Sequence, residues 1–138
     1  MVLRLNPYIA FRDTAAEAMA FYQSVFGGEL EVTRFGDVPM PNVGPDDAGK
    51  VMHSMLTIDG GLTLMGADTP AHMDVPSNNH AISLSGDDDA TLRRWWDGLA
   101  DGGTITMPLN VAPWGDAFGE LKDKFGISWL VNIAGPQS

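Results

Sequence analysis

The feature that most constrains the fold is an internal repeat. Two glycine pairs, Gly27-Gly28 and Gly102-Gly103, lie 75 residues apart (102 minus 27), and each ends a segment whose apolar residues have helical spacing. In each half, one strand-like segment precedes the helix and three follow it. A duplicated strand–helix–three-strand unit predicts an α+β protein made of two similar βαβββ modules.

The repeat also predicts the domain organisation. We place the two modules at about residues 1–68 and 78–138, joined by a linker at about 67–79 that contains Pro70 and Pro76. One such module leaves a face of its own sheet uncovered, so the two are expected to share a core. The whole chain, residues 1–138, is therefore predicted to be a single domain.

Hydrophobic periodicity predicts where the elements begin and end. The predicted strands cover residues 3–11, 29–36, 50–58, 62–66, 80–85, 104–108, 116–122 and 127–133. Thr14 and Glu17 have the spacing of a capping box, which predicts that Thr14 caps the first helix. In the second helix we expect Trp95 on the buried stripe, and Trp96 at its edge, where it is available to a subunit interface.

Composition limits the partners that the chain can have. It has 18 acidic and 8 basic residues and a formal charge of −10, which repels nucleic acids and anionic membranes. We therefore expect no nucleic-acid and no membrane partner. Cysteine is absent, which excludes disulfides and thiolate catalysis. The N-terminus lacks the pattern of a signal peptide, and the expected location is cytoplasmic.

Several stretches of the chain resemble a known family. They are Ala16 to Gly28, Val51 to Ser54, Met107 to Leu109 with Trp114 to Asp116, and Lys122 to Trp129. In these stretches the chain resembles the vicinal oxygen chelate superfamily (glyoxalase I, bleomycin-resistance proteins and extradiol dioxygenases), and within it the PhnB-like group. The resemblance implies a curled mixed-sheet funnel with helices outside, and a homodimer. In active relatives, the funnel holds one divalent metal bound by His, Gln or Glu from four strand positions.

Those four positions can be read from the resemblance together with the alternation of each strand. They correspond to Asn6, His53, Ala81 and Leu130. A divalent transition metal usually takes at least three nitrogen or oxygen ligands, and this set offers one imidazole and one weak amide. We therefore predict a degenerate metal site and no cofactor. The alternative is a strand slip that adds His80 to His53 and restores a Zn, Ni, Mn or Fe site, as in a glyoxalase-type lyase, isomerase or dioxygenase.

The predicted function is small-molecule binding, and whether a reaction follows stays open. The residues expected to line the site are Asn6, Tyr8, His53, Met55, Ser83, Trp114 and Phe118. Trp114 and Phe118 are expected on a loop spanning residues 107–119, over the funnel mouth. His53 is the candidate catalytic residue, as a general base or an orienting donor; its other interpretation is a hydrogen-bonded cavity residue without a reaction.

Two expectations about charge refine this interpretation. We expect no Asp or Glu at a funnel-facing strand position, which leaves His53 without a carboxylate to orient it. We also expect no Lys or Arg at such a position after Arg4, which disfavours a dianion such as a phosphonate. The ligand is therefore expected to be apolar or aromatic.

Overall fold

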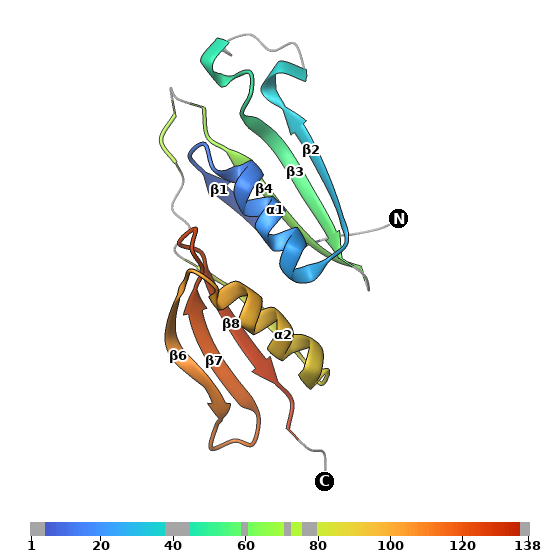
Figure 1. Cartoon of the computed structure of the whole chain (residues 1–138), viewed down its shortest axis with the longest axis vertical. Helices are drawn as coiled ribbons and strands as arrows, with labels where there is room; N and C mark the ends of the chain where they lie inside the picture. The colour runs from blue at the N-terminus through green and yellow to red at the C-terminus, as the bar shows by residue number, and fades with distance from the viewer. Residues whose placement is uncertain (1–4, 38–44, 59–60, 71–72, 76–79, 136–138) are drawn as a thin grey trace. The chain divides into compact units, whose positions relative to one another are not determined.

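The structure, a computed structural model, describes residues 5–37, 45–58, 61–70, 73–75 and 80–135. The chain divides into two compact units, Met1–Ser77 and Asn78–Ser138 (Figure 1). Each unit is one four-stranded mixed sheet with one long helix, which confirms the α+β class and the duplicated element order. Among the described helices, none has the length and apolar character needed to cross a membrane.

The first unit is built around a sheet of order β1-β4-β3-β2. Its elements are β1 (Tyr8–Phe11), α1 (Ala15–Phe26), β2 (Glu29–Arg34), two short 3₁₀ turns (Phe35–Asp37 and Pro45–Asp47), β3 (Val51–Ile58) and β4 (Leu62–Asp68). Strands β1 and β4 are parallel, and the other neighbours are antiparallel. Helix α1 contacts β2, β3 and β4, and thereby covers one face of this sheet.

The second unit repeats this arrangement with a sheet of order β5-β8-β7-β6. Its elements are β5 (Ala81–Gly86), α2 (Asp89–Ala100), β6 (Thr104–Val111), β7 (Ala117–Lys122) and β8 (Ser128–Ile133). Strands β5 and β8 are parallel, as β1 and β4 are in the first unit. The identical strand order and pairing confirm the repeat that the glycine pairs predicted.

The predicted alternation of buried and accessible faces is confirmed in both sheets. On the helix side of the first sheet, Ile9, Leu56 and Ile58 are buried; in the second sheet, Trp129 and Val131 are. The opposite face of each sheet carries partly or fully exposed side chains, and we call it the distal face. On the first sheet, it presents Tyr8, Ala10, Glu31, His53, Met55, Thr57 and Met65; on the second, Ala81, Ser83, Ser85, Phe118, Glu120, Lys122, Ser128, Leu130 and Asn132.

The first strand is shorter than the predicted span of residues 3–11. It begins at Tyr8, and Leu5 is 99% exposed, while residues 1–4 lie outside the described residues. Proline has no N–H to donate to a neighbouring strand. Pro7 can therefore only accept a bond, which it does from Met65 N at 3.0 Å, and regular pairing starts after it.

The predicted capping box at the start of α1 is wrong. Thr14 occupies the cap position but makes no side-chain cap hydrogen bond. Asp68 replaces it: its carboxylate accepts from Ala15 N at 2.9 Å and also from Val51 N at 2.9 Å. A buried carboxylate at the end of β4 thus ties the helix start to β3, a long-range contact that a local motif cannot reveal.

The prediction of which tryptophan of α2 is buried is also wrong. Trp96 is buried, at 6% exposure, and Trp95 is only half-buried. The reason is a close approach at β7: a Cβ at Gly119 would lie 2.7 Å from Cη2 of Trp96. The missing side chain of Gly119 makes the room in which the Trp96 indole packs.

The segment 107–119 is mostly a hairpin rather than the predicted loop. Strand β6 continues past residue 108 to Val111, and β7 begins at Ala117, so only 112–116 form the turn. The pairing of β6 with β7 shifts register between Ile105 and Met107 and again before Asn110. Pro108 lies within this irregular stretch, and such bulges let an edge strand continue past a proline.

Candidate functional site

His53, the candidate catalytic residue, lies on the distal face of the first sheet and stacks on Tyr8. The two ring centroids are 5.9 Å apart and the planes differ by 29°. The rings come from β3 and β1, which are separated in the sheet by β4. Partial burial raises the pKa of Tyr8 above its usual value of 10.0, so its phenol is neutral at physiological pH.

The other two predicted residues of the first unit also lie near this stack. Met55 is paired with Met65 of β4 on one side and with Glu31 of β2 on the other. The side-chain oxygen of Asn6 accepts a hydrogen bond from the Thr63 hydroxyl, so part of its acceptor capacity is already used.

The expectation that no acidic residue shares a face with His53 is wrong. Glu31 is opposite Met55, and its position is diagonal to His53 on the distal face. The register of β2 against β3 cannot be read from the alternation of either strand, so the sequence does not predict that Glu31 lies near His53. The described residues contain no hydrogen bond between Glu31 and the His53 ring, so the structure gives His53 no carboxylate partner.

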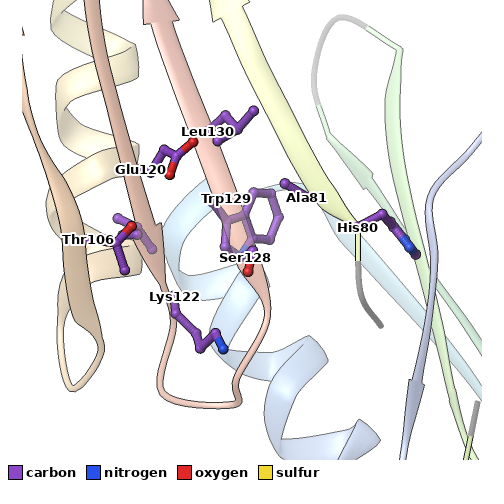
Figure 2. A pocket seen from close by; sticks show the side chains of 9 residues that line it. His80, Ala81, Thr106, Glu120, Lys122, Ser128, Trp129 and Leu130 are labelled. Atoms are coloured by element: carbon purple, nitrogen blue, oxygen red, sulfur yellow. The ribbon is translucent and has the colours of Figure 1, made fainter. Parts of the chain in front are cut away.

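A hollow of about 210 Å³ lies on the distal face of the second sheet (Figure 2). It is lined by His80, Ala81, Thr106, Glu120, Leu121, Lys122, Ser128, Trp129 and Leu130. Of these residues, strand alternation places Ala81, Ser128 and Leu130 on the funnel side, and His80 entered only through the alternative. The structure adds a threonine and two opposite charges.

Lys122 in this hollow corrects the expectation that no Lys or Arg follows Arg4 on such a face. It is two residues from Glu120 on β7 and directly opposite Ser128 of β8. Alternation along 116–122 was enough to find it, because Phe118, Glu120 and Lys122 share one parity.

Four polar side chains of the hollow have no partner in the part of the chain that the structure describes. Within the described residues, Thr106, Glu120, Lys122 and Ser128 make no side-chain hydrogen bond or ion pair. Glu120 and Lys122 also do not bridge to each other. Polar side chains that converge on a concave surface without internal partners are the groups that orient a ligand in a binding site.

The strand under the hollow is anchored from the other side of the sheet. Trp129 of β8 is buried on the helix side, and its indole nitrogen donates to Asp123 at 2.8 Å. Asp123 is 3% exposed and accepts two more hydrogen bonds, from Phe125 N at 2.8 Å and Ile127 N at 3.1 Å. One buried carboxylate therefore holds both the turn between β7 and β8 and the start of β8, which carries Ser128 and Leu130.

The predicted aromatic pair lies at the other end of the same face. Trp114 and Phe118 meet edge to face, with centroids 6.0 Å apart, and Trp114 is 64% exposed. Neither ring lines the hollow. Ser83 is paired with Leu130, which places it between the hollow and the aromatic pair. The structure thus brings Trp114 and Phe118 together, on the turn and strand rather than on a long loop.

Beside the aromatic pair, Asp116 fixes the end of the sheet. It accepts from Asn132 Nδ2 at 3.0 Å and from Gly135 N at 2.8 Å. These hydrogen bonds hold the pKa of Asp116 below its usual value of 3.8, and the bond from Asn132 has the larger effect. Asp116 therefore holds Asn132 and the chain after β8 in place.

The four family positions offer a divalent metal too few donor atoms. Of the four family positions, Ala81 and Leu130 have no side-chain atom that can bind a metal. The side-chain oxygen of Asn6 already accepts a hydrogen bond from the Thr63 hydroxyl. These side chains do not fit a divalent transition metal, which needs at least three donors. No cluster of three or more His, Asp or Glu that could hold an ion occurs in the part of the chain that the structure describes.

His80, the second ligand of the metal alternative, precedes β5 and is exposed. Figure 2 shows its ring directed away from Glu120 and Leu130. His53 belongs to the first unit and His80 to the second. The alternative of a site shared by these two histidines therefore stays a prediction, and so does the expectation that no cofactor is bound.

Comparison with known proteins gives relatives over almost the whole chain. The chain is 30% identical to Protein YjdN of Escherichia coli K12, over 96% of the chain and 97% of that protein. It is 32% identical to the uncharacterized protein Rv0887c of Mycobacterium tuberculosis, over 91% of the chain and 71% of that protein.

Solved structures agree with these relatives. The structure of PA1353 from Pseudomonas aeruginosa has a TM-score of 0.84 and 34% identity, covering 96% of this chain and 98% of that one. A PhnB protein from Bacillus cereus, named a putative 3-demethylubiquinone-9 3-methyltransferase, has a TM-score of 0.72 and 27% identity, covering 96% and 100%. The family model of the Glyoxalase/Bleomycin resistance protein/Dioxygenase superfamily matches residues 4–131. This match covers most of the chain, and the duplicated unit with its two four-stranded sheets agrees with it. The chain therefore belongs to that superfamily.

Proposed function

We propose that this protein binds a small organic molecule on the distal face of its second sheet, and that it does so without the divalent metal of its active relatives. The observation that carries the proposal is the hollow around Leu130, in which the side chains of Thr106, Glu120, Lys122 and Ser128 have no partner among the described residues. A concave surface that combines apolar side chains with unpaired polar groups can hold and orient a small ligand.

The rest of the distal face supports the same function. Trp114 and Phe118 offer an aromatic surface beside the hollow, and Trp114 is exposed enough to stack on a ligand. The ligand is therefore amphipathic, with an apolar or aromatic part and polar groups that reach Glu120 or Lys122. On the first sheet, taken by itself, Asn6, Tyr8, His53 and Met55 are proposed as a separate contact surface for a small molecule, and any reaction there would use His53 as the base.

Two further expectations rest on the sequence. The resemblance to the superfamily favours a homodimer, and light scattering should give twice the chain mass of 14.8 kDa; a mass near that of one chain contradicts it. We also propose a cytoplasmic location, which cell fractionation tests.

A thermal-shift screen tests the proposal. A ligand that binds only the folded state raises the melting temperature, so a panel of aromatic and amphipathic compounds should contain members that do so. The shift should fall in Leu130→Ala and Trp114→Ala and persist in Leu62→Ala, a control at an exposed leucine of the first unit. A panel without any shift, or shifts that all three variants retain, contradicts the proposal.

A further inference from the structure

We infer that the hollow selects zwitterions, compounds that carry an ammonium group and a carboxylate on one short apolar stem. This inference rests on the proposed function and names the class of its ligand. It assigns the ammonium group to Glu120 and the carboxylate to Lys122, with Ser128 beside the lysine.

The spacing of the two charges is set by the strand. Glu120 and Lys122 are separated by one residue on β7, and residues two apart on one face of a strand are roughly 7 Å apart. In Figure 2, the Glu120 carboxylate lies near Leu130, and the Lys122 side chain extends away from Glu120, beyond Ser128. The two charged groups therefore lie at opposite ends of the hollow, and the described residues show no ion pair between them.

The remaining side chains complete a two-ended site. Ser128 is opposite Lys122 on the neighbouring strand, so its hydroxyl can donate to a carboxylate held by the ammonium group. Leu130 is opposite Glu120, and Ala81 is opposite Ser128, so the stem of the ligand would lie against apolar atoms. Each end of a zwitterion then meets its complement, and the methylenes between them are sheltered from water.

The charge of the whole protein favours a zwitterion over a simple anion. A formal charge of −10 repels any ligand with net negative charge, and one lysine in the hollow offsets little of that field. A zwitterion has no net charge and keeps the carboxylate contact. The hollow, at about 210 Å³, is smaller than the roughly 300–1,000 Å³ of sites for drug-sized ligands, which favours a compact molecule.

Calorimetric titration with a matched series of probes tests the inference. The zwitterions are γ-aminobutyrate, δ-aminovalerate and ε-aminocaproate, which differ in the distance between their charges, and the single-charge controls are caproate and hexylamine. The best zwitterion should bind at least tenfold more tightly than either control. The Lys122→Gln variant should lose this preference over hexylamine, and the Glu120→Gln variant its preference over caproate.

Matched variants make each outcome decisive. Lys124→Gln and Glu31→Gln remove the same charges from residues outside the hollow and should leave the preference unchanged. Equal affinity for zwitterions and controls, or a preference that survives in Glu120→Gln and Lys122→Gln, overturns the inference. If no ω-amino acid binds but an aromatic compound binds in a way that depends on Leu130, the inference fails and the proposed function stands.

Discussion

The indole nitrogen of Trp129 donates a hydrogen bond to the buried carboxylate of Asp123, 2.8 Å away, and this bond anchors β8 from the helix side of the sheet. We predict that Asp123→Ala destabilises the protein by about 2–4 kcal/mol, since it leaves the indole and two backbone N–H groups without their acceptor. Urea denaturation followed by tryptophan fluorescence measures the change.

The control for this prediction is Asp101→Ala, which removes an exposed carboxylate at the end of α2. Surface substitutions of this kind change stability by at most about 0.5 kcal/mol. If Asp123→Ala were as stable as the control, the three hydrogen bonds would not support the turn between β7 and β8.

The lowered pKa of Asp116 predicts how stability depends on pH. A carboxyl group whose pKa is depressed by folding stabilises the native state above its unfolded pKa of about 3.8, and this contribution is lost as the pH falls through the lower folded pKa. Wild type should therefore be more stable than Asp116→Asn at neutral pH, and the difference should shrink below about pH 4.

Denaturant midpoints measured at several pH values check this prediction. Asp101→Asn serves as the control, because that exposed carboxylate makes no side-chain hydrogen bond within the described residues. A difference between wild type and Asp116→Asn that stays constant down to acid pH would show that the bonds to Asn132 and Gly135 do not depend on the charge.

The close packing at Gly119 predicts a steric effect. An added Cβ would lie 2.7 Å from Trp96 and 2.9 Å from the backbone of Leu109, so Gly119→Ala should destabilise the protein by about 1–3 kcal/mol. Gly49→Ala is the control, since nothing lies within 4 Å of its added Cβ. Thermal unfolding measures both variants.

A double mutant separates the tryptophan clash from the backbone clash. If the Trp96 ring is what the new methyl group meets, Gly119→Ala should cost less in a Trp96→Phe background than in wild type. Strictly additive effects would mean that the contact with Leu109 alone accounts for the loss.

The sequence was sufficient for the architecture because the repeat and the strand alternation are local patterns. Alternation correctly placed His53 and Leu130 on the distal faces, and the glycine pair at Gly27 correctly ended α1. Sequence patterns gave wrong predictions where contacts between distant residues determine the local structure. Asp68, which is 53 residues from Ala15, takes over the cap of α1, and the gap at Gly119 decides which tryptophan of α2 is buried.

The site was predicted only in part, for a related reason. The resemblance indicates the family metal positions and the aromatic residues Trp114 and Phe118, and it indicates none of the charged residues of the hollow. Alternation alone puts Glu120 and Lys122 on one face of their strand. Which side chains they meet across the sheet, as Lys122 meets Ser128, depends on the register of β7 against β8. That register is set by the folded sheet and is not contained in the period of either strand.

The most direct test of the account is the metal content of the purified protein. Cells would be grown with added Zn, Ni, Mn and Fe, and the metals bound to wild type and to His53→Ala would be measured by mass spectrometry. Because only two of the four family positions carry donor atoms, we predict far less than one ion per chain, and no difference between the two proteins. A stoichiometric divalent metal in wild type that is lost in His53→Ala would contradict the account.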